Sequence, residues 1–189
     1  MRELKPGEFK SKNDLSAMVW NSSGFQSAVE GALSELVGLR LSASTSVTDG
    51  RWFYFGDFAP KTDCENYLVL MLDSAWRIEV DQRVVVGACD YGCPGSELNP
   101  LQDLQTQLLD RFFGSTVDDY HLPVGRERIV RTFEVDVYGG FVMTFDDETR
   151  LRVFPCGAEL QWMILRPDRQ GSFMVGDCGY ADTRLADPV

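Results

Sequence analysis

The chain has 189 residues, 44% of them hydrophobic and 25% charged, which indicates a soluble globular protein of one domain or two small fused ones. Its net charge of −11 repels a phosphate backbone, which argues against nucleic-acid binding, and favours a basic partner. No run approaches the ~18 to 20 apolar residues of a membrane span, and the N-terminus lacks the apolar segment of a secretory signal. We therefore expect a cytoplasmic protein with no membrane partner.

The cysteine and histidine content argues against a metal site or a disulfide. The five cysteines are odd in number in a chain without an export signal, which is typical of free thiols. Cys89 and Cys93 have C-x-x-x-C spacing rather than the C-x-x-C of redox and zinc motifs, and His121 is the one histidine. We expect no metal and no cofactor.

The first predicted element follows a polar stretch, residues 1–21, that is expected to be a flexible arm. Apolar residues from Phe25 to Leu36 recur with helical spacing, which predicts an amphipathic helix over residues 24–37. Ser23 and Gln26 fit a capping box at its start, and Gly38 fits a stop signal at its end.

Five strands are predicted next. They cover residues 39–44, 51–57, 66–73, 75–80 and 83–89, with a tight turn at Asp81-Gln82 between the last two. The unbroken apolar run YLVLML, within residues 66–73, indicates a strand that is buried on both faces.

A second amphipathic helix is predicted, with Asn99 as its N-cap, Pro100 as its first residue and Gly114 as its stop. Five more strands follow, over residues 131–138, 141–145, 149–154, 160–165 and 172–178. Their apolar residues alternate, as in Phe141, Met143 and Phe145, which is typical of antiparallel strands with one face in water.

A short sequence occurs twice: Val-Gly-x-Cys-x-Tyr stands at residues 86–91 and again at 175–180. Each copy ends a series of helix, glycine, aromatic strand, apolar strand and tryptophan strand. We therefore predict two related halves, residues 22–92 and 93–180, with a tail at 181–189, in a single compact domain. Cys89 and Cys178 are expected to pack in the core, with a thiol chemistry at both positions as the alternative.

The predicted fold class is α+β: two amphipathic helices packed on antiparallel β-sheet, built from the two helix-plus-meander halves. In this scheme Gly38 corresponds to Gly114, Trp76 to Trp162, and Gly87 to Gly176.

A search for catalytic motifs finds no phosphate-binding loop, dinucleotide fingerprint, nucleophile elbow or zinc-protease helix. His121 lies in the polar stretch DDYHLPVG and is expected to be an exposed loop residue; a general base paired with Asp118 or Asp119 is the alternative. The carboxylate pairs Glu79/Asp81 and Glu134/Asp136 are expected to be solvent-facing strand charges rather than metal or acid–base groups. No catalytic residue is assigned.

The best candidate for a binding face is aromatic. Four aromatic residues in a row, Trp52 to Phe55, alternate across a strand, so one pair must face away from the main core. That pair is expected to pack under the helices; the alternative is an exposed aromatic groove rimmed by Asp57, Asp63 and Glu65. The candidate binding residues are Trp52, Tyr54, Asp57, Asp63, Glu65, Asp118 and Asp119.

The motifs LVGL, WFYFG, WRI, GGF, LRVFP and QWMILRP, spread over residues 30–178, resemble those of a family of small uncharacterised bacterial proteins. The resemblance implies a bacterial origin and shared aromatic strands and turns. It implies no activity, cofactor or catalytic residue.

Two classes of function fit these observations. The first is a non-enzymatic acidic protein that binds a basic partner, in its specific form an immunity or antitoxin-like inhibitor of a basic toxin. The second is a small-ligand-binding protein or enzyme with its site between the two halves. An assembly component whose acidic face contacts itself or a neighbour is a third.

Overall fold

The computed structural model describes residues 22–47, 50–62, 66–90, 103–125, 127–155, 160–167, 171–176 and 179–183. The fold is α+β. The two α-helices of the described part are α1 (Phe25–Ser34) and α2 (Leu104–Phe113), and a 3-10 turn, η2, spans Ala88–Asp90. The strands are β1 (Leu41–Val47), β2 (Gly50–Gly56), β3 (Tyr67–Leu72), β4 (Ala75–Val80), β5 (Arg83–Gly87), β6 (Gly114–Val117), β7 (Tyr120–Pro123), β8 (Val130–Val135), β9 (Phe141–Phe145), β10 (Arg150–Phe154), β11 (Trp162–Arg166), β12 (Gly171–Gly176) and β13 (Gly179–Asp182).

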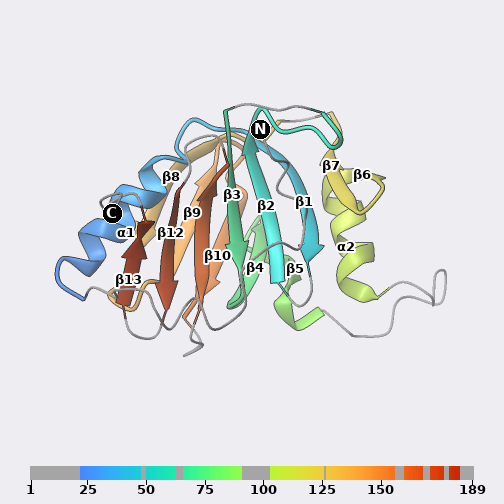
Figure 1. Cartoon of the computed structure of the whole chain (residues 1–189). Helices are drawn as coiled ribbons and strands as arrows, with labels where there is room; N and C mark the ends of the chain where they lie inside the picture. The colour runs from blue at the N-terminus through green and yellow to red at the C-terminus, as the bar shows by residue number, and fades with distance from the viewer. Residues whose placement is uncertain are drawn as a thin grey trace.

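The strands form two antiparallel sheets that face each other (Figure 1). The 8-stranded sheet has the order β13-β12-β11-β3-β2-β1-β7-β6, and the 5-stranded sheet has the order β5-β4-β10-β9-β8. The chain changes sheet four times, between β3 and β4, between β5 and β6, between β7 and β8, and between β10 and β11. Each sheet therefore combines strands that are distant in the sequence. In the 8-stranded sheet β3 pairs with β11, and in the 5-stranded sheet β4 pairs with β10.

The main core lies between the two sheets. Aromatic side chains from both sheets meet there edge to face: Phe53 contacts Trp76 with ring centroids 5.5 Å apart, and Phe141 contacts Trp162 at 5.3 Å. The helices close the sides of this layer, since α1 contacts β8 and β13 while α2 contacts β5, β6 and β7 (Figure 1). The apolar stripe of each helix thereby joins the same core.

Helix α1 is shorter than predicted and has a different start. It ends at Ser34, after which residues 35–38 form turns, and its N-cap is Gly24 with φ 66° and no side-chain cap. The capping box predicted from Ser23 and Gln26 is wrong, because Gln26 instead donates to the Glu30 carboxylate one turn later. The predicted inward positions Val29, Ala32 and Leu33 are buried, as expected.

Helix α2 ends as predicted, at Gly114, whose φ of 95° is a left-handed cap that glycine adopts without strain. The Asp103 carboxylate accepts a hydrogen bond from the Thr106 N–H at 3.0 Å and caps its start. The predicted start at Asn99 and Pro100 lies outside the described residues.

The repeated motif does not occupy matching places. In the first copy the motif glycine, Gly87, lies opposite Arg77, the residue after Trp76. In the second copy it is the valine before the motif glycine, Val175, that lies opposite the corresponding tryptophan, Trp162. The two copies therefore differ in register relative to the tryptophan strand. The predicted core position of Cys89 is also wrong, because β5 ends at Gly87 and η2 carries the Cys89 thiol out of the sheet to an exposed position. Cys178 lies outside the described residues.

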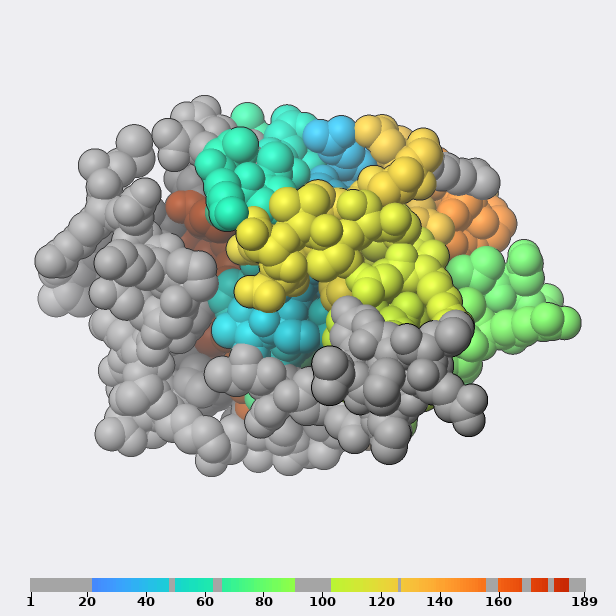
Figure 2. All heavy atoms as spheres, turned by 90° about the vertical axis from the view of Figure 1, so that its right-hand side faces the viewer, coloured from blue at the N-terminus to red at the C-terminus, as the bar shows by residue number. Residues whose placement is uncertain are grey.

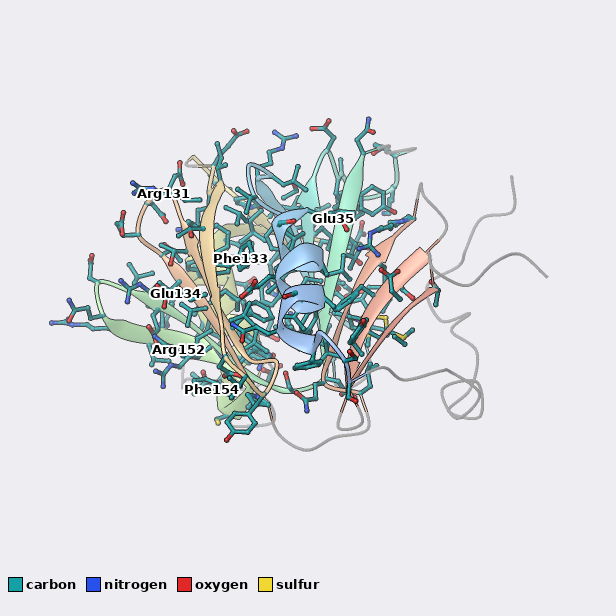
Figure 3. All side chains as sticks on the ribbon, turned by 90° about the vertical axis from the view of Figure 1, so that its left-hand side faces the viewer. Glu35, Arg131, Phe133, Glu134, Arg152 and Phe154 are labelled. Atoms are coloured by element: carbon teal, nitrogen blue, oxygen red, sulfur yellow. The ribbon has the colours of Figure 1, made fainter. Side chains whose placement is uncertain are left out.

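The outer face of the 5-stranded sheet is polar, and Arg131, Glu134, Arg152 and Phe154 point away from the core (Figure 3). Burial raises the pKa of Glu79 on this face, but hydrogen bonds from Arg152 and then Arg77 outweigh it, so the pKa lies below its usual value. The carboxylate receives the Nε–H groups of Arg77 at 2.5 Å and Arg152 at 3.2 Å. Glu79 therefore joins two neighbouring strands. Its prediction as a solvent-facing charge is wrong, because it is buried beside the two arginines.

Candidate functional site

The aromatic pair predicted to face away from the main core does so. Phe53 and Phe55 of β2 point between the sheets, while Trp52 and Tyr54 lie on the outer face of the 8-stranded sheet. Both outer side chains are nonetheless buried, with exposed fractions of 8% and 6%. They pack against other strand and loop residues rather than beneath either helix, so the predicted packing under the helices is wrong.

Tyr54 is the centre of an aromatic cluster that brings three chain segments together. Its ring stacks on Phe58 with centroids 4.0 Å apart, meets Tyr120 edge to face at 5.6 Å, and contacts Tyr67 at 6.4 Å. Burial, and the nearby Tyr120 hydroxyl, raise the pKa of Tyr54 far above its ordinary value, so its phenol stays neutral. The cluster fixes the position of the 57–62 loop against β7.

A groove of about 400 Å³ lies beside this cluster, between the 57–62 loop and the segment that follows β7. Its apolar lining is Leu41, Phe58, Ala59, Pro60, Leu122 and Pro123, and its polar lining includes Arg40, Ser42 and Glu127. Val124, the first residue after β7, has an exposed apolar side chain. None of the lining residues was predicted as a binding residue, although the apolar pairs Ala59-Pro60 and Leu122-Pro123 each stand next to polar residues in the sequence.

Acidic side chains surround this end of the molecule. Arg40 forms an ion pair with Glu127 at 2.8 Å and a longer one with Asp57 at 3.5 Å, and all three side chains are exposed. Lys61 pairs with Asp118 at 2.6 Å, which joins the 57–62 loop to the β6–β7 turn. The loop and the β6–β7 hairpin lie next to each other on the face drawn in Figure 2.

Three of the predicted acidic residues therefore belong to this end of the molecule. Asp57 is in the loop, while Asp118 and Asp119 form the β6–β7 turn, where the Asp119 carbonyl accepts a hydrogen bond from the Thr45 hydroxyl at 2.7 Å. Asp63 and Glu65 lie outside the described residues. The candidate binding face thus consists of the groove, its acidic surroundings and the buried ring of Tyr54.

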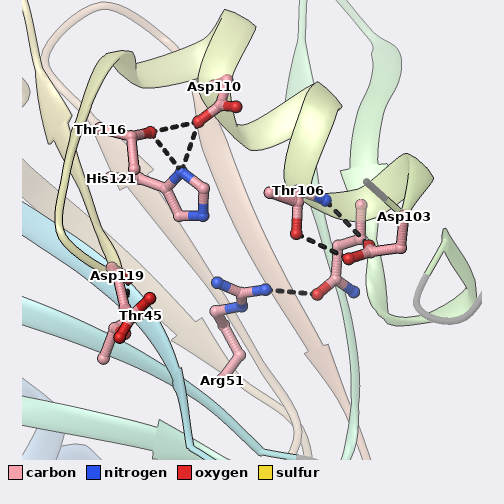
Figure 4. A network of polar contacts seen from close by, with 9 residues as sticks. Thr45, Arg51, Asp103, Thr106, Asp110, Thr116, Asp119 and His121 are labelled. Atoms are coloured by element: carbon pink, nitrogen blue, oxygen red, sulfur yellow. Dashed lines mark hydrogen bonds and ion pairs between the residues drawn. The ribbon is translucent and has the colours of Figure 1, made fainter. Parts of the chain in front are cut away.

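The environment of His121 differs from the prediction. It lies on β7 rather than in a loop, is buried, and its Nδ1 is 2.9 Å from Asp110 of α2 rather than near Asp118 or Asp119 (Figure 4). The Thr116 hydroxyl also donates to the Asp110 carboxylate. Burial and then the charge of Arg51 lower the pKa of His121, and the bond with Asp110 only partly opposes them.

The predicted carboxylate pairs have structural roles. Asp136 accepts hydrogen bonds from the Tyr138 and Gly140 N–H groups at 2.8 and 3.0 Å, which forms the turn before β9, while Glu134 is exposed on β8. Asp81 is in the turn between β4 and β5 with a φ of 49°. Among the described residues no three His, Cys, Asp or Glu side chains gather as a metal-binding group.

Comparison with protein-family models, with curated proteins and with solved structures finds no match to this chain. Within the described part of the chain, neither helix has the length and apolar character needed to cross a membrane.

Proposed function

We propose that this protein binds a basic polypeptide in the groove between the 57–62 loop and the end of β7. The observation that carries the proposal is an apolar groove with carboxylates at its edge. Phe58, Pro60 and Leu122 offer an apolar surface for an anchoring side chain, while Glu127 lines the groove and Asp57 adjoins Phe58. Apolar anchors within a charged edge are the usual composition of a protein-binding surface.

The charge of this end selects the partner. Four exposed carboxylates lie at this end: Glu127 lines the groove, Asp57 precedes the lining residue Phe58, and Asp118 and Asp119 form the β6–β7 turn. Their cationic partners among the described residues are Arg40 and Lys61. The remaining negative charge, on a chain of net charge −11, attracts a basic surface and repels an acidic one. An immunity protein, which inhibits a basic toxin by binding it, fits this combination of an apolar groove and negative charge.

We also infer that the two halves are related, through equivalent strands rather than through the repeated cysteine motif. A matching pair of main-chain hydrogen bonds and a matching irregularity in strand register support this. The Leu41 N–H donates to Arg128 O at 2.8 Å and the Val130 N–H donates to Leu39 O at 2.9 Å. Both β1 with β2 and β8 with β9 have an irregularity in register at the same place, next to Leu41 and Val130 respectively.

The strand order supports the same inference. Suppose that α1 corresponds to α2, and that β1 to β5 correspond in order to β8 to β12. Then β3 corresponds to β10 and β4 to β11, so the pairing of β3 with β11 predicts a pairing of β10 with β4. Both pairings are present. The halves would then have exchanged their last strands. The β6–β7 hairpin and the groove beside it have no counterpart in the first half of the described chain, which makes this end the place where a function would be added.

The proposed binding is tested with basic proteins encoded next to the gene of this chain, each expressed singly and measured by titration calorimetry at low and high salt. We expect one of them to bind, more weakly at high salt because the carboxylates are exposed. The double substitution Asp57→Asn, Glu127→Gln should raise Kd about tenfold. Its control, Asp81→Asn, Glu134→Gln, removes the same charge outside the groove and should leave Kd within about twofold.

The proposal is wrong if none of these basic proteins binds. It is also wrong if the groove variant and its control bind the basic protein with the same Kd. The attraction would then come from the net charge of the whole chain rather than from the carboxylates at the groove.

A further inference from the structure

A second cavity opens on the inner side of β1 and β2, whereas Tyr54 lies on the outer side, and it shares no lining residue with the groove. Its volume is about 240 Å³, and it is bounded by the inner faces of β1 and β2, the β3–β4 connection, Ala88 and the first turn of α2. This is smaller than the ~300 Å³ at which sites for drug-sized molecules begin, so it suits a small metabolite. Residues from both predicted halves line it.

A buried arginine dominates the chemistry of this cavity. Arg51 of β2 faces inward, like Phe53 on the same strand, and is only 3% exposed. Its Nη2, which Figure 4 shows at the end of the labelled Arg51 side chain, donates to Gln105 Oε1 at 2.5 Å. The Gln105 Nε2 donates in turn to Gly87 O at 2.8 Å. Gln105 therefore holds the guanidinium at the cavity wall. A guanidinium removed from water in this way is a strong receptor for an oxyanion.

A hydroxyl in the cavity wall adds a second polar group. Ser74, in the β3–β4 connection, is 6% exposed, and its Oγ has no hydrogen-bond partner among the residues that the structure describes. Buried hydroxyls nearly always have a partner, so an isolated one at a cavity indicates a place for a ligand atom. Beside these groups Leu72 and Trp76 give the cavity an apolar wall.

We propose that this cavity binds a small monocarboxylate, with Arg51 and Ser74 holding its carboxylate and Leu72 and Trp76 contacting its carbon skeleton. The carboxylate is favoured over a phosphate because the exposed Asp73 also lines the cavity and repels a dianion. The same Asp73 would attract the ammonium group of an α-amino acid. This site is separate from the groove, and neither proposal depends on the other.

The first experiment is thermal unfolding of the full chain with small monocarboxylates, from acetate and pyruvate to the L-α-amino acids, each beside its own amide, and with inorganic phosphate. A ligand that binds only the folded chain raises the midpoint by about 5 to 11 °C at a hundred times its Kd. We expect such a rise for at least one carboxylate and none for its amide. The proposal is overturned if no carboxylate differs from its amide, or if phosphate alone raises the midpoint.

A variant then assigns the shift to the cavity. Ser46 is an exposed residue of the cavity lining and lies opposite Arg51 in the β1–β2 register, so Ser46→Trp fills the cavity beside Arg51 while the arginine itself is kept. Its control is Thr132→Trp, an equally exposed strand position on the outer face of the 5-stranded sheet. The shift should disappear in Ser46→Trp and persist in Thr132→Trp. A full shift in Ser46→Trp places the carboxylate elsewhere and refutes the site. Arg51→Met, checked for folding by circular dichroism, should weaken binding of the same carboxylate about a hundredfold.

Discussion

The buried ion pair between Arg166 and Glu35 gives the sharpest test of how α1 is held on the sheets. Arg166 of β11 is fully buried, with a side chain that is 0% exposed, and Glu35 follows the last residue of α1. Two parallel hydrogen bonds join them, from Nε to Oε2 and from Nη2 to Oε1, both 2.7 Å long. This is the forked geometry in which an arginine and a carboxylate interact most strongly.

The substitution Glu35→Gln removes the charge that compensates Arg166 while keeping nearly the same shape. Leaving a buried charge without its partner costs about 3 to 5 kcal/mol. For a chain of this size, each kcal/mol lowers Tm by about 2 to 4 °C, so we expect Tm to fall by about 6 to 20 °C. Glu30→Gln makes the same chemical change on the exposed face of the same helix and should cost less than about 0.5 kcal/mol.

The assay is denaturant unfolding followed by the fluorescence of Trp76 and Trp162, which both lie in the core. The double variant Arg166→Met, Glu35→Leu should recover most of the loss, because an apolar pair of similar volume needs no charge compensation. A Glu35→Gln variant that unfolds at the same denaturant concentration as Glu30→Gln would refute the reasoning.

Three further predictions concern single positions. A Cβ on Gly140 would lie 2.5 Å from Asp136 Oδ2 and 2.9 Å from Val153 O, so Gly140→Ala should cost about 1 to 3 kcal/mol in denaturant unfolding; Gly31→Ala, on the open face of α1, should not destabilise. The lowered pKa of His121 means that its stabilisation is complete above about pH 6.5 and is lost as pH falls below it toward the folded-state pKa. Unfolding free energies at a series of pH values from 7.5 downward should therefore fall less steeply in His121→Gln than in the parent chain, and equal slopes would contradict this. The exposed thiol of Cys89 should react with a thiol reagent in the folded chain, and Cys89→Ser should remove one equivalent of that fast reaction.

The local elements could be read from the sequence because their signals are local. The apolar stripe of α1, the alternation in β9, the doubly buried β3 and the Asp81-Gln82 turn are all present as predicted. The β6–β7 hairpin was missed because its four-residue strands are too short to give a period, and because the acidic residues around Asp118 mimic a loop.

The partners of the strands could not be predicted from the same signals. Alternation places Leu70 and Ile164 on inward faces, but nothing in either segment indicates that β3 pairs with β11 rather than with β4. The same limit applies to the candidate sites. The position of Arg51 on the inner face follows from its spacing to Phe53, yet the cavity depends on Gln105, which a distant helix supplies.

The repeated change of sheet along the chain has a consequence for how the chain can be divided. β4 and β5 complete a sheet with β8 to β10, and β6, β7 and β11 to β13 complete one with β1 to β3. Neither end of the chain can therefore assemble its own two-layered core. Folding must wait for contacts between remote segments, which is slow relative to folding by local contacts. A chain cleaved between β5 and α2 should yield two pieces that are unstructured alone and that reassemble when mixed.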